Sequence, residues 1–326
     1  MQRRAAWALI MMLILALTAT AAAPGARAGD FPSQPLRLII GFPPGSAADI
    51  TARLVGNHMS ETLGQQMVIE SRTGAGSGIA AEFVARAPAD GYTLYIGTSS
   101  NLTNAAINPN LRLDLAKDFA PVTPLTLLPL ILAVHPSLGV ASVQDLVALA
   151  KSKPGELTYA SVGIGTVPHL SSELFAVRTQ IKLVHVPYQG SPPAVTDLLA
   201  GRVSMMLGVA STILPHDDSG KLKALAVSSV KRAHVAPNVP TMAEAGLPDF
   251  EAGVWFGLVA PAGTPRPIID KLSAAANDAL AANDVAAKLR AQAFEPMGGP
   301  PDEFAQFIAR ETIKWTAAAE AAGLRK

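Results

Sequence analysis

The chain alternates between short β-rich runs and longer runs of helical period. This alternation constrains the fold most, because strands that are separated by helices form parallel or mixed sheets with helices packed against them. The runs predict strands over residues 36–40, 67–70, 93–98, 130–135, 157–161, 183–187, 203–207, 222–228 and 253–260. The sequence therefore predicts an α/β fold built from mixed sheets flanked by helices.

The length and the positions of the apolar runs predict two lobes. The longest apolar run after residue 28 covers residues 125–134, and Pro129 interrupts it. We expect this run to cross from one lobe to the other, and the chain to return between Pro240 and Trp255. The expected lobes are residues 29–129 with 250–326, and residues 130–249.

Residues 1–28 have the pattern of a secretory signal peptide rather than of a folded segment. Arg3 and Arg4 precede an apolar stretch, and Ala26-Arg27-Ala28 fits the rule for signal-peptide cleavage. We expect cleavage after Ala28 and a periplasmic mature protein. The alternative is an uncleaved membrane anchor, although the apolar stretch is short for a membrane span.

The composition excludes several classes of site. The chain has no cysteine, which excludes disulfides, thiolate metal sites and cysteine nucleophiles. Its formal charge of +1 becomes −2 once the three arginines of residues 1–28 are removed. A nucleic-acid-binding protein would carry a basic face instead.

The run LRLIIGFPPGSAAD at residues 36–49 joins a strand to a helix through a glycine- and proline-rich loop. Such a junction presents backbone N–H groups to a small anion. Similar loops at residues 73–78, 163–166 and 189–193 also follow strands and precede helical runs. Two loops come from each expected lobe, so the sequence predicts a cleft suited to a carboxylate. Neither glycine pair completes a dinucleotide fingerprint, and no P-loop occurs.

No sequence motif indicates a catalytic or metal site. No serine has glycine at both −2 and +2, and no pair of histidines has metal-ligand spacing. His169, Asp49 and Asp197 lie near the loops and are the candidates for a catalytic base. Residues 216–218 resemble hard-metal ligands, but a solvated turn is the favoured interpretation. We therefore predict no catalytic residue, no metal and no cofactor.

Few aromatic residues lie near the loops. Phe42 lies inside the first loop, Tyr188 directly precedes the fourth, and Trp255 falls where the chain returns between lobes. Phe42 and Tyr188 would hold an apolar ligand body between them. Packing in the core is the alternative for all three side chains.

The chain resembles the extracytoplasmic solute receptors of tripartite tricarboxylate transporters, the TctC-like or Bug receptors. The resemblance covers nearly all of the chain after residue 28, and the first motif reads PPGSAAD. The stretch VPYQGSPPA followed by DLLAGRV is the most specific. In order, the similar segments are residues 43–49, 71–78, 90–94, 153–159, 163–170, 186–203, 240–246 and 255–265. Ser46 and Ser71 replace the glycine and asparagine typical of the family.

The resemblance implies a two-lobed, type II periplasmic-binding-protein fold that closes around a carboxylate held by backbone N–H groups, hydroxyls and water. It implies a monomeric receptor that delivers an organic acid to a membrane transporter of the tripartite tricarboxylate type. The alternatives are a ligand-binding component of a sensory system and a secreted enzyme acting on a small organic acid. We expect the ligand contacts to be Phe42, Pro44, Gly45, Ser46, Thr98, Ser99, Ser100, Ser161, Gly163, Thr166, Tyr188 and Gly190.

Overall fold

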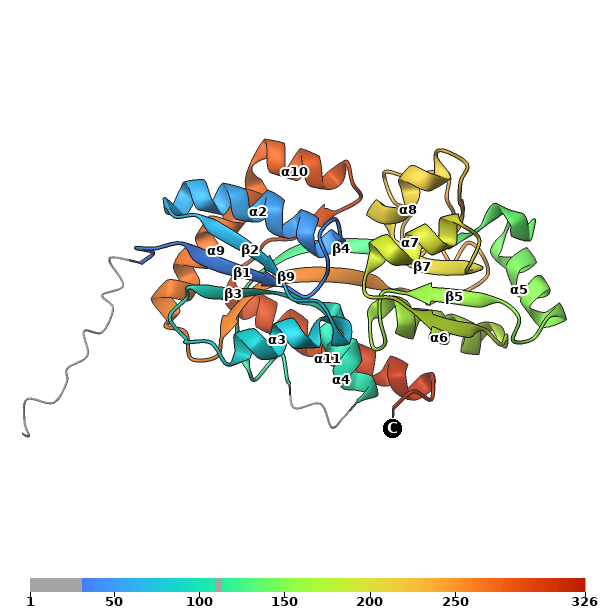
Figure 1. Cartoon of the computed structure of the whole chain (residues 1–326), viewed down its shortest axis with the longest axis horizontal. Coiled ribbons are helices and arrows are strands. Elements are labelled where there is room, and N and C mark those ends of the chain that lie inside the picture. The colour runs from blue at the N-terminus through green and yellow to red at the C-terminus, as the bar shows by residue number, and fades with distance from the viewer. Residues whose placement is uncertain (1–30, 109–112, 326) are drawn as a thin grey trace, which may run out of the picture.

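The computed structural model describes residues 31–108 and 113–325, so the predicted signal peptide lies outside the described residues. Strands and helices alternate along most of the chain (Figure 1). In chain order they are β1 (Leu36–Ile40), α2 (Ala47–Leu63), β2 (Met67–Ser71), α3 (Gly78–Ala85), β3 (Thr93–Thr98), α4 (Ser99–Ile107), β4 (Phe119–Val134), α5 (Val143–Ser152), β5 (Thr158–Ser161), α6 (Val167–Thr179), β6 (Val184–Pro187), α7 (Ser191–Leu199), β7 (Met205–Val209), α8 (Ala210–Asp217), β8 (Lys223–Val227), β9 (Gly253–Pro261), α9 (Arg266–Ala281), α10 (Asn283–Arg290), β10 (Glu295–Pro296) and α11 (Pro301–Ala321).

The strands form two groups that share β4. In lobe 1 the order is β2-β1-β3-β9-β4, with β10 also paired to β4. In lobe 2, β4 pairs with β7 and β8, and the sheet continues through β5 to β6. Pairs such as β1–β3 and β5–β6 are parallel, whereas β9 and β4 pair antiparallel. The predicted mixed sheets are confirmed.

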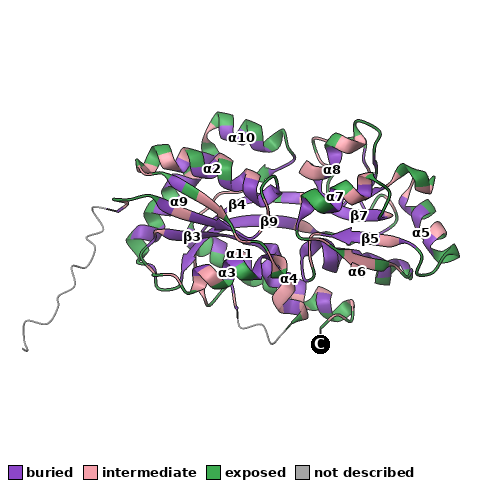
Figure 2. Cartoon of the chain, in the orientation of Figure 1, coloured by how far each residue is buried: buried purple, intermediate pink, exposed green. Residues whose placement is uncertain are grey.

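Helices cover both faces of each sheet (Figure 1). In lobe 1, α2, α9 and α10 lie on one face, and α3, α4 and α11 lie on the other. In lobe 2, α7 and α8 lie opposite α6. The strands are buried between these layers while the outer helix faces remain exposed (Figure 2). The fold is therefore the predicted two-lobed α/β fold.

β4 is the element for which the predicted bounds were too short. The sequence predicted a strand over residues 130–135, whereas β4 begins at Phe119. Prolines 121, 124 and 129 argued against a strand there because proline donates no hydrogen bond to a sheet. The structure accommodates the first two where the pairing of β4 with β9 shifts register, at Pro121/Thr123 and Pro124/Thr126.

The lobes join where β4 changes partners. Residues up to Pro129 pair with β9, and residues from Leu130 pair with β7 in lobe 2. Buried Ser228 ties this point to the returning chain. Its Oγ accepts a hydrogen bond from the Leu130 N–H at 2.8 Å and donates to the Ala252 carbonyl at 2.5 Å.

We propose lobe limits of 29–129 with 250–326, and 130–249. The change of partners after Pro129 supports the first crossing, and the Ser228–Ala252 bond supports the second. Among the described residues, no helix is both long and apolar enough to cross a membrane.

Candidate ligand-binding cleft

Four loops, two from each lobe, enclose a hollow of about 320 Å³ between the lobes. We call it the outer chamber. The loops follow β1 and β2 in lobe 1, and β5 and β6 in lobe 2. Its lining residues are Gly41, Phe42, Gly74, Ala75, Gly76, Ser77, Val162, Gly163, Ile164, Pro187, Tyr188 and Gln189.

A smaller hollow of about 30 Å³ adjoins the outer chamber, since Phe42 and Val162 line both. We call it the inner chamber. Residues from the first turns of α2, α4, α6 and α7 contribute to its wall, and apolar side chains complete it. Its lining residues are Phe42, Ser46, Ala47, Ala48, Ser100, Val162, Pro168, Ser191, Val209, Val254 and Phe256.

Helix N-termini border the inner chamber, and no charged side chain lines it. The first N–H groups of a helix have no partner inside it, and the helix dipole places partial positive charge there. Ser46 caps α2 by accepting the Asp49 N–H at 3.4 Å. The preceding N–H groups, of Ala47 and Ala48, therefore have no intrahelical partner, and both residues line the chamber.

The lining residues of both chambers carry no formal charge. Ionised groups near the loops are engaged with one another. Asp49 accepts the Gly45 N–H at 3.0 Å and pairs with Arg53 at 3.0 Å. Asp197 accepts the Tyr188 hydroxyl at 2.7 Å, and burial followed by this bond raises the pKa of Tyr188 to about 12. An anion in this cleft would therefore be held by backbone dipoles rather than by an ion pair.

The two lobes touch across the cleft, so this is a closed state. Gly190 has a φ of +124°, and a Cβ there would lie 2.6 Å from the Pro43 side chain. Gly76 has a φ of +59°, and a Cβ there would lie 2.9 Å from the Ile164 carbonyl oxygen. Both positions favour glycine, because other residues rarely adopt such φ values and a side chain would hold the lobes apart.

Two stacked histidines support the loop at residues 163–166. Ser161 Oγ lies 2.7 Å from His185 Nε2 and accepts the Gly163 N–H at 3.2 Å. His169 Nδ1 accepts the Gly165 N–H at 3.3 Å, and the two imidazole rings are 4.3 Å apart. Burial lowers the pKa of both histidines, that of His185 to about 4 with a further contribution from His169. Both rings are therefore neutral at neutral pH.

Five of the twelve predicted contacts line a chamber: Phe42, Ser46, Ser100, Gly163 and Tyr188. Of the other seven, Thr98 and Ser99 lie at the junction of β3 and α4, and the rest lie in or beside the four loops. Four of the seven use their hydroxyls in the protein: Thr98 caps α4, Ser99 Oγ accepts the Trp255 N–H, Ser161 Oγ accepts the Gly163 N–H, and Thr166 donates to the Gly163 carbonyl. The remaining three are Pro44, Gly45 and Gly190.

Sequence reasoning missed some of the lining. The loop TGAGSG was identified as a ligand loop, yet none of its residues was named, and residues 74–77 line the outer chamber. Ser191 and Val209 at helix starts were also missed. The signal for Ser191 was present, because it opens the SPP helix start after the fourth loop.

The three candidate catalytic bases occupy structural positions. Asp49 belongs to the start of α2, Asp197 fixes Tyr188, and His169 holds the Gly165 N–H. The predicted turn at residues 216–218 is instead the C-terminal end of α8, with Asp218 as its C-cap, and Asp217 accepts the Ala224 N–H at 2.8 Å. In the part of the chain that the structure describes, no group of three His, Asp or Glu residues is arranged for a metal.

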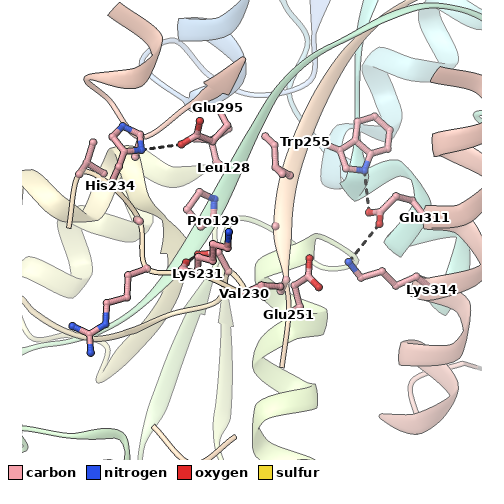
Figure 3. A pocket seen from close by; sticks show the side chains of 18 of the residues that line it. Leu128, Pro129, Val230, Lys231, His234, Glu251, Trp255, Glu295, Glu311 and Lys314 are labelled. Carbon is pink, nitrogen blue, oxygen red and sulfur yellow. Dashed lines mark hydrogen bonds and ion pairs between the residues drawn. The ribbon is translucent and has the colours of Figure 1, made fainter. Parts of the chain in front are cut away.

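A larger hollow of about 450 Å³ lies away from these loops, where the two lobes join. We call it the hinge cavity (Figure 3). Its wall combines residues of β4, β9 and α11 with the segment 229–235 of lobe 2. Trp255 donates its indole N–H to Glu311 at 3.2 Å, and His234 pairs with Glu295 at 2.9 Å.

The sequence model of the family described as "Tripartite tricarboxylate transporter family receptor" matches residues 51–324. Protein BugT of Bordetella pertussis is 37% identical over 314 residues, covering 96% of each chain. The solved structure of R. palustris Rpa4515 with adipate has a TM-score of 0.87 at 38% identity, covering 90% of this chain and 99% of that one.

MatC from Rhodopseudomonas palustris with bound malate has a TM-score of 0.85 at 34% identity, covering 88% of this chain and 99% of that one. Together with the two-lobed fold and the cleft between its lobes, these matches confirm the resemblance seen in the sequence. The chain therefore belongs to the TctC family of tripartite tricarboxylate transporter receptors.

Proposed function

We propose that this protein captures a small organic acid in the cleft between its lobes and delivers it to a membrane transporter of the tripartite tricarboxylate type. The observation that carries the proposal is the convergence of four helix N-termini, from both lobes, on one uncharged chamber. A helix N-terminus binds an anion through its free N–H groups, and at α2 these are the N–H groups of Ala47 and Ala48. Family members solved with adipate and malate support a carboxylate as the ligand.

Delivery to a transporter requires that the two lobes close when the acid binds. A ligand that contacts both lobes binds the closed state better than the open one and shifts the population toward it. The carboxylate enters the inner chamber and the rest of the acid fills the outer chamber. Direct contacts come from Phe42, Ser46, Ser100, Gly163 and Tyr188, while the other seven predicted residues shape the loops and the rim. No bond is made or broken.

A thermal-shift screen of mono-, di- and tricarboxylates, each paired with its amide, tests capture. A ligand at 100 times its Kd adds about 2.7 kcal/mol of stability. We expect one or more acids to raise Tm and the matched amides to leave it unchanged. If no organic anion changes Tm, the proposed function is wrong.

Delivery to a transporter requires its own test. Deleting the gene should abolish uptake of the radiolabelled acid by whole cells, and the wild-type gene should restore it. A variant that binds no acid should fail to restore uptake. Normal uptake in the deletion strain would contradict the transport role.

We further propose that residues 1–28 are a signal peptide cleaved after Ala28, and that the mature protein is a periplasmic monomer. The arginine pair, the apolar stretch and the Ala-Arg-Ala site support this proposal. N-terminal sequencing of exported protein should begin at Gly29, and sedimentation should give a single-chain mass. A mature protein that begins at Met1 would contradict it.

A further inference from the structure

A side-chain hydrogen bond crosses the cleft from one lobe to the other. Thr103 lies on α4 in lobe 1, and its Oγ1 donates to the Gly165 carbonyl of lobe 2 at 2.5 Å. We call this contact the cross-cleft bond. The Thr103 side chain is buried, and neither residue lines a chamber. The bond therefore joins the lobes beside the ligand site rather than within it.

The Thr103 hydroxyl has a second acceptor on its own helix, the Ser100 carbonyl at 3.3 Å. Because a hydroxyl carries a single proton, the two carbonyls compete for it, and Gly165 is the nearer one in this closed state. When the lobes separate, the proton turns to Ser100, a bond of the kind that threonine forms within helices. The cross-cleft bond can therefore break without leaving a buried donor unpartnered, and this makes it reversible.

Gly165 is also held by its own lobe. His169 Nδ1 accepts the Gly165 N–H at 3.3 Å. A Cβ at Gly165, where φ is +79°, would lie 2.7 Å from Oδ1 of Asn104, the residue after Thr103. Asn104 in turn donates its Nδ2 to the Ala75 carbonyl at 3.0 Å, in the loop of lobe 1 that lines the outer chamber. Two adjacent residues of α4 thus contact one ligand loop from each lobe.

The cross-cleft bond fixes walls of both chambers relative to one another. Gly163 and Ile164 directly precede Gly165 and line the outer chamber. Ser100 lies one turn before Thr103 on α4 and lines the inner chamber. A ligand that touches these walls binds more tightly when they are already held in place, because less freedom is lost on binding.

We propose that Thr103 is a positioning residue for ligand capture, whose hydroxyl stabilises the closed state through the Gly165 carbonyl without touching the acid. This inference rests on the proposed carboxylate-binding function and adds a residue that controls closure. The bond from Ser228 to the Ala252 carbonyl has another role, because it lies where the crossing strands join the lobes.

Two substitutions at Thr103 separate the hydroxyl from the shape of the side chain. Thr103→Val keeps the shape and removes the hydroxyl, whereas Thr103→Ser keeps the hydroxyl. In a calorimetric titration with adipate, the acid in one solved relative, Thr103→Val should lose about tenfold in affinity, or about 1.4 kcal/mol. Thr103→Ser should stay within about threefold of the wild type. A loss in the serine variant with none in the valine variant would assign Thr103 a packing role and overturn the proposal.

Thr179→Val is the matched control. Thr179 is also a buried helical threonine, but its hydroxyl donates to the Phe175 carbonyl of its own helix, α6, at 2.7 Å. Its substitution removes a buried hydroxyl without touching the other lobe, so affinity for adipate should stay at the wild-type value. An equal loss in Thr179→Val and Thr103→Val would overturn the proposal.

Closure itself is measured by pulsed electron paramagnetic resonance. The chain has no cysteine, so Glu82→Cys on α3 and Val177→Cys on α6, both exposed, place one spin label on each lobe. Thr103→Val should shift the distances toward the open state, with and without adipate, and Thr103→Ser should restore them. Equal closed fractions in Thr103→Val and the wild type would overturn this inference and leave the carboxylate receptor intact. If no acid of the wider screen binds, the proposed function fails, and the ligand-free distances still decide the role of Thr103.

Discussion

The cleft and the hinge cavity are both walled by both lobes, yet they differ in chemistry. The hinge cavity is larger, at about 450 Å³ against about 320 Å³ for the outer chamber. Its wall carries both signs of charge, including Lys231, Glu251 and Lys314 (Figure 3). None of its lining residues lies in the first turn of a helix. The comparison shows why we propose the cleft as the anion site: helix N-termini border it, whereas the larger hinge cavity has none.

The largest loss of carboxylate affinity is expected from a substitution at the rim of the cleft. Gly190→Ala places a Cβ against Pro43 and strains a φ of +124°, so the lobes can no longer close fully. We expect carboxylate affinity to fall by about 100-fold, or about 2.7 kcal/mol, in a calorimetric titration.

Gly139→Ala is the matched control for the Gly190 variant. Gly139 also has a positive φ, +66°, but a Cβ there would meet nothing within 4 Å. Its substitution strains the backbone without touching the cleft, so affinity should remain at the wild-type value. If the two variants bind a carboxylate equally well, contact between the lobes does not control affinity.

The next largest effect is a loss of stability, expected from a substitution where the two lobes join. Ser228→Ala leaves the Leu130 N–H and the Ala252 carbonyl without their partner in a buried position. Unfolding in urea should show a loss of about 1–3 kcal/mol in the free energy of unfolding. Exposed Ser152→Ala should change it by less than about 0.5 kcal/mol. Equal stability of the two variants would show that Ser228 does not hold the crossing strands together.

The histidine stack should make stability depend on pH. Burial lowers the pKa of His169 and His185, that of His185 to about 4, so the unfolded chain binds protons more readily than the folded one. Stability from this source is present above pH 6.5 and is lost as the pH falls toward 4. The Tm of the wild type should therefore drop over this range more steeply than that of the double variant His169→Gln, His185→Gln. Parallel curves would contradict this account.

The smallest effect is expected in the hinge cavity. Lys231 is exposed and lines that cavity but neither chamber of the cleft. Lys231→Ala should change carboxylate affinity by less than about twofold, because Lys231 lies outside the cleft and salt screens the interaction between exposed charges. A tenfold loss of carboxylate affinity would indicate that the anion binds in the hinge cavity and not in the cleft.

Much of the fold could be predicted because local sequence patterns determine where its strands and helices lie. Two strands, Leu36–Ile40 and Thr93–Thr98, have the expected bounds. The first half of β4 could not be predicted, since it contains three prolines, and the first two lie where the pairing with β9 shifts register. Such pairing depends on a segment more than 100 residues away, which no local pattern reveals.

The site was predicted at the level of loops rather than of side chains. Glycines and prolines mark where strands end and helices begin, so the sequence predicted the four loops that enclose the outer chamber. It did not show that the hydroxyls of Thr166 and Ser161 form hydrogen bonds with Gly163. Those hydrogen bonds depend on the backbone conformation of the loop, which the sequence pattern does not reveal. Ser46, where the family typically has glycine, caps α2 and also lines the chamber.

The most direct test of the account is a crystal structure of the mature protein grown with a bromine-substituted form of the acid that raises Tm most in the screen, with data collected at the bromine absorption edge. The anomalous peak reports both the site and the orientation of the acid. The account predicts bromine in the outer chamber near Phe42 and Tyr188, and the carboxylate in the inner chamber between Ser46 and Ser191. Bromine in the hinge cavity, or a carboxylate directed out of the cleft, would contradict it.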